Sequence, residues 1–174
     1  SNCMICNNDF DGFKYGIWSS CNNLNNIIIN NNFSSHDSGS IAINLIPFIN
    51  EVNTVLIKDN IFNFSYCGVA LEGSMNSIIM DNVFYNSSYG IHFFGDNSSL
   101  IGNSFISHNV GAVISGDNAY IYSNNFTLNS YGLKLYGNNG SIISNNIVEN
   151  GHGVFSPNPD NLCVNFNRIA SNSV

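Results

Sequence analysis

The feature that most constrains this chain is a short unit, Asn-x-Phe or Asn-x-Ile, that recurs along its whole length. Successive units lie 21 to 23 residues apart, except for one interval of 29 between Phe33 and Phe62. A fixed period of this length is typical of solenoid proteins. The apolar residues of the unit are Phe10, Phe33, Phe62, Phe84, Phe105, Phe126, Ile147 and Ile169. A glycine is expected to follow at the same period, and these glycines are Gly16, Gly39, Gly68, Gly90, Gly111, Gly132 and Gly153.

Each period contains three short apolar runs separated by Asn, Asp, Ser and Gly, as in residues 78–80, 83–84 and 91–93. Such runs are typical of strands joined by turns, and no window shows helical periodicity. We therefore predict an all-β right-handed parallel β-helix of about eight rungs, with three strands per rung and almost no helix. It forms a single domain over residues 1–174. The excess of the long interval is assigned to a loop insertion at residues 45–53, where Pro47 ends a strand.

Stacking of rungs converts each position of the repeat into a column of like residues. The asparagines of the unit are predicted to form an internal ladder in which each amide bonds its neighbours above and below and tolerates the left-handed backbone of a tight turn. The aliphatic residue after each glycine is expected to point inward and the next residue outward. The ladder consists of Asn8, Asn31, Asn60, Asn82, Asn103, Asn124, Asn145 and Asn167.

Composition excludes several classes of partner. Four Lys and Arg residues against eleven Asp and Glu residues give a net charge of −7, which would repel a phosphate backbone, so no nucleic acid partner is expected. No apolar run is long enough to insert into a membrane, and the printed chain has no signal peptide.

The repeats, as in Asn82-Val83-Phe84 through Gly90-Ile91, resemble those of pectate-lyase-like right-handed β-helix proteins. Within that superfamily, asparagine-rich repeats poor in Lys and Arg are most similar to the adhesin-like surface proteins of archaea. The resemblance implies a secreted protein with an extracellular or cell-surface role, and it indicates fold much more specifically than function.

An enzymatic interpretation rests on Gly151-His152-Gly153 and Arg168-Ile169, which are similar to a sequence pair of polygalacturonases. One rung before His152 the chain has Asn129-Ser130-Tyr131, so no carboxylate is available there to act as acid or base. We therefore expect a protein that is not an enzyme. The alternative is a polysaccharide hydrolase or lyase on the same scaffold.

Two pairs of acidic residues fall in repeat columns, Asp59 with Asp81 and Asp96 with Asp117. Turn residues exposed to solvent are one interpretation of them. A bound cation, for which Ca²⁺ is the candidate, is the second, because stacked carboxylates repel each other. A catalytic pair is the third, because carboxylates one strand spacing apart are near the separation used by retaining glycosidases. No other cofactor is expected.

A row of outward residues is predicted to form a binding face for glycans or cell-surface proteins, since exposed aromatic rings mark interaction surfaces. Its residues are Trp18, His92, Phe94, Lys134, Tyr136 and Phe155. A second outward row, just before the glycines, contains Tyr15, Cys67, Tyr89, Val110, Tyr131 and His152.

No capping segment is visible at either end of the repeats, so we expect either a longer array or end-to-end self-association into filaments, in which Cys163 would approach Cys3 and Cys6. Sequons at Asn86, Asn97 and Asn139 are candidates for glycosylation. The sequence thus predicts a structural or adhesive β-helix outside the cell.

Overall fold

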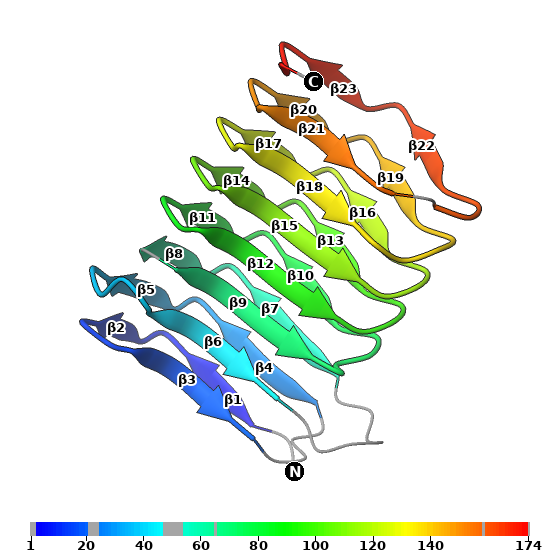
Figure 1. Cartoon of the computed structure of the whole chain (residues 1–174). Helices are drawn as coiled ribbons and strands as arrows, with labels where there is room; N and C mark the ends of the chain where they lie inside the picture. Colours follow the sequence, from blue (N-terminus) through cyan, green and yellow to red (C-terminus); the bar gives the residue numbers. More distant parts are fainter. Residues whose placement is uncertain (1–2, 21–24, 47–53, 65, 158, 174) are drawn as a thin grey trace.

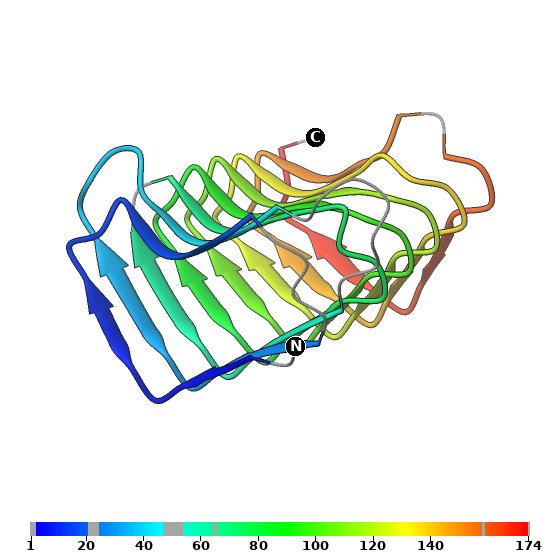
Figure 2. The same cartoon turned by 90° about the horizontal axis from the view of Figure 1, so that it is seen from below.

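The computed structural model describes all residues except 1–2, 21–24, 47–53, 65, 158 and 174. The described residues form a parallel β-solenoid of seven turns with three strands each, followed by two strands of an eighth turn. The turns stack in sequence order, so the two termini lie at opposite ends of the molecule (Figures 1 and 2). The predicted fold class is confirmed. The described part of the chain has no helix with the length and apolar character needed to cross a bilayer.

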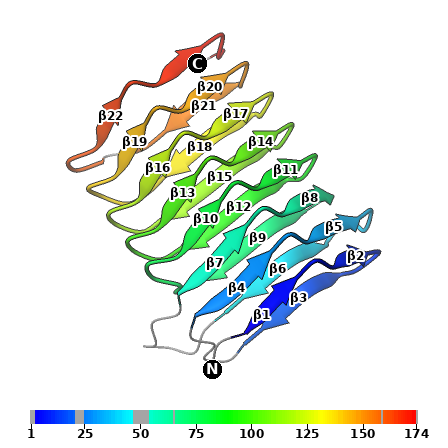
Figure 3. The ribbon, with the colours of Figure 1, turned by 180° about the vertical axis from the view of Figure 1, so that it is seen from behind.

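Three parallel sheets run along the solenoid, and every strand pairs with the equivalent strand one turn away. The first sheet, seen from behind in Figure 3, contains β1 (Met4–Cys6), β4 (Asn26–Ile29), β7 (Val55–Lys58), β10 (Ile78–Met80), β13 (Ser99–Ile101), β16 (Tyr120–Tyr122), β19 (Ser141–Ile143) and β22 (Cys163–Asn165).

The second sheet contains β2 (Asp9–Asp11), β5 (Asn32–Ser35), β8 (Ile61–Phe64), β11 (Val83–Tyr85), β14 (Ser104–Ile106), β17 (Asn125–Thr127), β20 (Asn146–Val148) and β23 (Arg168–Ala170). The third sheet, which faces the viewer in Figure 1, contains β3 (Tyr15–Ser19), β6 (Ile41–Leu45), β9 (Cys67–Glu72), β12 (Tyr89–Phe94), β15 (Val110–Ser115), β18 (Tyr131–Leu135) and β21 (His152–Phe155).

The core is built from stacked columns of identical or similar side chains. Neighbouring phenyl rings of the repeat unit, from Phe10 to Phe126, lie parallel with centroids 4.5 to 5.0 Å apart. Glycine lies beside this column because space is lacking: a Cβ on Gly68 would lie 2.5 Å from the carbonyl oxygen of Gly90 and 2.7 Å from the ring of Phe84. The inward aliphatic residues after the glycines are fully buried in the central turns, as at Val69 and Ile91, and partly buried in the first and seventh turns, at Ile17 and Val154.

The asparagine ladder forms through hydrogen bonds that repeat from Asn8 to Asn167. Asn82, for example, donates its backbone N–H and its Nδ2 to Oδ1 of Asn103, at 3.1 and 3.0 Å, and donates Nδ2 to the Ile57 carbonyl at 2.9 Å. One detail of the prediction is wrong, because the left-handed residue is the one before each ladder asparagine. Asp59 and Asp81 occupy two of these positions, with φ of 54° and 55°.

A second internal ladder, which the sequence analysis did not identify, follows the second sheet. It is mixed in residue type, running through Ser87, His108, Asn129, Asn150 and Asn172. The His108 ring takes the place of an amide: Nδ1 lies 3.1 Å from the Ser87 backbone nitrogen and Nε2 lies 3.1 Å from the Phe84 carbonyl oxygen. These partners fix the tautomer that carries its proton on Nε2.

The irregular second turn differs from its prediction. Ala42, and not Gly39, occupies the glycine column there, because Gly16 and Ala42 lie between the paired residues Tyr15–Ile41 and Ile17–Ile43. Three residues are inserted before β6, where Gly39 lies in an exposed turn. The other additional residues of the 29-residue interval come after Leu45, the last residue of β6. Residues 47–53 of the expected insertion lie outside the described residues.

Candidate ligand-binding groove on the third sheet

A groove crosses the outer face of the third sheet along β15, between β12 and β18, with a volume of about 370 Å³. Its lining residues are Tyr89, His92, Phe94, Val113, Ser115, Lys134 and Tyr136. Because strands in a sheet are about 4.8 Å apart, the two banks stand about 10 Å from each other. That width accommodates a single extended polymer chain.

The floor of the groove is low because β15 carries small outward residues where its neighbours carry large ones. Register places Val113 between His92 of β12 and Lys134 of β18, and it places Ser115 beside Phe94. Val113 is only 6% exposed, since the larger side chains on both sides shield it. Register alone therefore creates the groove from residues 21 positions apart.

The bank on β12 is a cluster of rings in mutual contact. The Tyr89 and His92 rings stack with centroids 5.7 Å apart, and Phe94 meets His92 edge-on at 4.6 Å. Burial lowers the pKa of His92, and the nearby Glu72 carboxylate opposes this effect by favouring the charged ring. Desolvation is the larger effect, so His92 is neutral at pH 7.

The bank formed by β18 and β21 holds the positive charge of the groove. Nζ of Lys134 lies 3.7 Å from the centroid of the Tyr131 ring, a cation–π contact that orders the lysine. Tyr131 also stacks on His152 at 4.4 Å, and Phe155 meets both Tyr131 and Tyr136 edge-on at 6.2 Å. The bank is therefore a preorganised aromatic surface with one ammonium group.

The structure brings together most, but not all, of the predicted face. His92, Phe94, Lys134 and Tyr136 line the groove, and Phe155 supports its β18 bank. Trp18 stands apart on β3, 59% exposed and separated from the groove by β6 and β9. In the second predicted row, Tyr89 and Tyr131 border the groove, whereas Cys67 and Val110 are not exposed as expected and are each only 2% exposed.

The acidic pairs act within turns. The Asp96 carboxylate accepts the backbone N–H of Asp117 at 2.8 Å, and the Asp117 carboxylate accepts that of Asn138 at 2.7 Å. The Asp59 carboxylate lies 3.5 Å from Nζ of Lys58. The Asp96 and Asp117 carboxylates therefore form a short ladder between turns, whereas the Asp59 carboxylate pairs with the neighbouring lysine.

The two residues of the enzymatic interpretation lie on different sheets. His152 is on β21 in the third sheet, stacked on Tyr131, whereas Arg168 is on β23 in the second sheet and donates to Oδ1 of Asn146 at 3.1 Å. They share no face of the solenoid.

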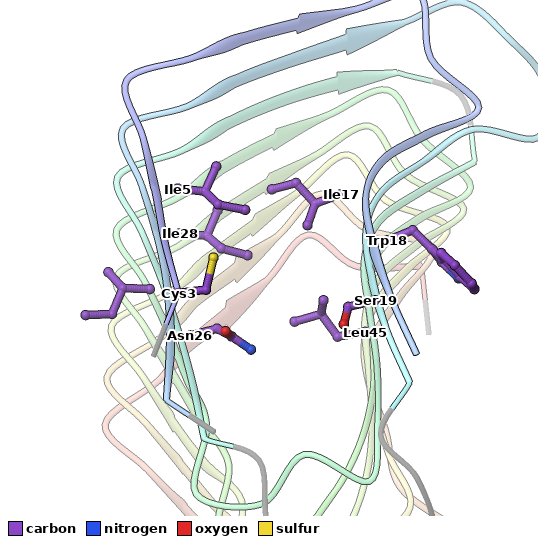
Figure 4. Close-up of a pocket in the computed structure, with 9 residues that line it drawn as sticks. Cys3, Ile5, Ile17, Trp18, Ser19, Asn26, Ile28 and Leu45 are labelled. Atoms are coloured by element: carbon purple, nitrogen blue, oxygen red, sulfur yellow. The ribbon is translucent and has the colours of Figure 1, made fainter. Parts of the chain in front are cut away.

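A second cavity, of about 220 Å³, lies inside the first two turns (Figure 4). Cys3, Ile5, Ile28 and Leu45 point into it, together with the amide of Asn26, while Trp18 points away. Cys3 supplies its one sulfur donor. The cavity is therefore largely apolar.

The three candidate sequon asparagines are exposed and lie in turns. Asn86, Asn97 and Asn139 have positive φ, and Asn97 and Asn139 each accept a hydrogen bond from the asparagine one turn later. Their glycosylation stays a prediction.

The fold and the groove define a class of protein, a parallel β-solenoid with one concave aromatic face. Within that class, residues 38–174 match the family described as periplasmic copper-binding protein (NosD), and the chain belongs to this family. A comparison with curated proteins finds no match. The family description agrees, in coarse terms, with the expected location outside the cytoplasm.

The expectation concerning cofactors is wrong, because the family description names copper, whereas we expected either none or Ca²⁺. Copper prefers imidazole, thiolate and thioether ligands. Within the described residues, no three His, Cys, Asp or Glu side chains come close enough together to hold a metal ion.

The two most deeply buried of these donors, His108 and Cys67, do not fit copper either. Both ring nitrogens of His108 are engaged in the second ladder. Burial raises the pKa of Cys67 to about 12, which opposes formation of the thiolate that a metal needs. The described residues thus do not form a copper site.

Proposed function

We propose that this protein is a non-catalytic, carbohydrate-binding β-solenoid that works outside the cytoplasm. The observation that carries the proposal is the groove along β15, with a low aliphatic and hydroxyl floor between two banks of rings. Ligand sites in proteins are concave, mostly apolar and aromatic, with a few polar groups that orient the ligand. A glycan offers apolar ring faces to the banks and hydroxyls to Ser115, Lys134 and His92.

The lining of the groove also favours binding over catalysis. Hydrolysis of a glycosidic bond uses two carboxylates on opposite sides of that bond. None of the residues that line the groove is Asp or Glu. The Asp96 and Asp117 carboxylates accept backbone amides, and Glu72, near His92, is a single carboxylate on one bank. Retention of an intact glycan fits an adhesin-like role at the cell surface, which is the finer expectation from the sequence.

Titration calorimetry with defined hexasaccharides tests the proposal: cellohexaose, xylohexaose and hexagalacturonate. We expect saturable binding of at least one of them, and Tyr136→Ala should weaken it about tenfold, because removing one central aromatic contact typically costs more than 1 kcal/mol. Tyr120→Ala, which removes a ring of comparable exposure from the first sheet (40% against 50% for Tyr136), is the matched control and should bind as the parent does. No binding of any probe, or equal losses in both variants, would contradict a glycan site in the groove.

A further inference from the structure

The outer face of the first sheet is mainly apolar. In β4 to β19 the inward residue of each strand is buried, and the residues on either side of it point outward. Strand pairing arranges these outward residues in two columns. The first column is Met4, Ile27, Leu56, Ile78, Ser99, Tyr120, Ser141 and Cys163, and the second is Cys6, Ile29, Lys58, Met80, Ile101, Tyr122, Ile143 and Asn165.

A sheet face that meets only water is normally polar at its outward positions. Here the large apolar residues keep considerable exposure: Ile78, Tyr120 and Tyr122 are 38%, 40% and 38% exposed. The face is flat, and its eight strands span about 34 Å (Figure 3). A continuous apolar patch of this extent marks an interaction surface.

The two columns are self-complementary. A two-fold axis parallel to the strands, placed between β10 and β13, would lay β7 of one copy over β16 of another. Lys58, the only charged residue of the columns, would then face the ring of Tyr122, and Leu56 would face Tyr120. An ammonium group over a tyrosine ring is a favourable contact, more so when desolvated.

Residue size shows the same complementarity. The operation that brings Lys58 to Tyr122 also lays β10 over β13 and β4 over β19. Ile78 then meets Ser99, and Ile27 meets Ser141, so that in these two first-column pairs a large residue lies opposite a small one. In the second column, Met80 meets Ile101 and Ile29 meets Ile143, which are apolar pairs. Sheets packed face to face in this way interdigitate at about 10 Å.

We infer that this face pairs two copies of the chain in a two-fold dimer with antiparallel solenoid axes. The choice of a second copy rests on the contact of Lys58 with Tyr122 and on the paired residue sizes. The two chains, each with a net charge of −7, repel each other at long range, and the interface adds no further repulsion because neither column contains an acidic side chain. Its footprint is about 340 Å² per copy, below the roughly 800 Å² of a standard interface, so the dimer is reversible.

Such a dimer would leave the third sheet free on both copies. Its two grooves would then face outward on opposite sides, where a dimer could hold two glycan chains at once. The inference stands on the first sheet alone and does not depend on what the groove binds.

Sedimentation equilibrium of the chain from micromolar to millimolar concentration tests the inference. We expect a monomer–dimer equilibrium. Tyr122→Asp should weaken it at least about tenfold, and Lys58→Gln should do so by a similar factor, since an isologous interface contains each contact twice. Thr127→Asp, an outward position on the neighbouring second sheet of the same turn, is the matched control and should dimerise as the parent does.

Thermal unfolding followed by circular dichroism checks that each variant is folded. If Tyr122→Asp does not fold, Lys58→Gln alone tests the interface. A monomer at every concentration would overturn the inference. Association that neither first-sheet variant weakens would also overturn it, because the contact would then lie on another face.

Discussion

At the scale of single residues, one buried histidine shows how much the ladders tolerate. His108 is 3% exposed and replaces an asparagine by presenting one acceptor nitrogen and one donor nitrogen at the positions of the amide. Burial lowers its pKa to about 4 from the ordinary 6.5. A protonated ring would have no acceptor for the Ser87 N–H and would be a buried cation, so protonation opposes folding.

This linkage predicts a loss of stability in acid. The unfolded chain binds a proton at His108 near pH 6.5, whereas the folded chain binds it only near pH 4. The free energy of unfolding is therefore unaffected by His108 well above pH 6.5 and falls as the pH drops below that value. Between pH 7 and pH 4 the free energy of unfolding should fall by about 3 kcal/mol through this residue. Urea unfolding at the two pH values measures it.

His108→Asn is the informative comparison, because asparagine is the residue that the ladder uses in the next turn. The variant keeps both hydrogen bonds and cannot be protonated, so it should lose less stability than the parent on acidification. The same pH dependence in both proteins would show that other groups, such as His92, are responsible.

At the scale of the repeating turn, buried hydrogen bonds hold the strands in register. The Asn103 side chain, for example, accepts the backbone N–H of Asn82 and donates to the Ile79 carbonyl oxygen, both in the preceding turn, and it donates to Oδ1 of Asn124 in the following turn. Each ladder asparagine thus connects adjacent turns where no strand does. The turn carboxylates make a similar but only half-buried bond, in which water can replace the lost partner.

We therefore expect Asn103→Leu to destabilise far more than Asp117→Ala. Asn103 is fully buried, and its replacement leaves the Asn82 N–H and the Ile79 carbonyl oxygen without partners, which should cost about 3 kcal/mol or more. Asp117→Ala removes one bond to the Asn138 N–H in a half-buried turn and should cost about 1 kcal/mol. Chemical unfolding compares the two variants, and equal losses would argue against the internal ladder as a source of stability.

At the scale of the whole molecule, charge contributes little to the fold. The described residues contain one ion pair, between Lys58 and Asp59, and the chain has a net charge of −7. Turns of a solenoid contact only their neighbours, so stability is approximately a sum over turns and the interfaces between them. Those interfaces consist of stacked apolar residues, amides and backbone hydrogen bonds.

Salt should consequently leave the melting temperature unchanged or raise it. Screening removes more repulsion among the acidic groups than attraction within the single ion pair. Differential scanning calorimetry at low salt and in about 1 M NaCl, where the Debye length is near 3 Å, measures the effect. A clear fall in melting temperature would mean that attractive charge pairs matter more than the ladders and the core.

The sequence by itself determined the solenoid, its three strands per turn and the asparagine ladder. A single residue type recurs at a fixed period, and stacking of turns of that length places these residues in one column. It did not reveal the second ladder, since serine, histidine and asparagine share that column, and no single letter repeats. It also misplaced Gly39, because a local match to the spacing conceals an insertion of three residues that only strand pairing reveals.

The tertiary structure alone decided which surfaces can bind. In first-sheet strands such as Ile78-Ile79-Met80 the inward and outward residues are all apolar, so alternation could not indicate that the outer face is exposed and apolar. The groove required register as well, because Val113 becomes a floor only between His92 and Lys134. Surfaces depend on neighbours 21 residues away, whereas the fold depends on the repeat itself, and this is the physical reason that the sequence predicts the fold more fully than it predicts the binding faces.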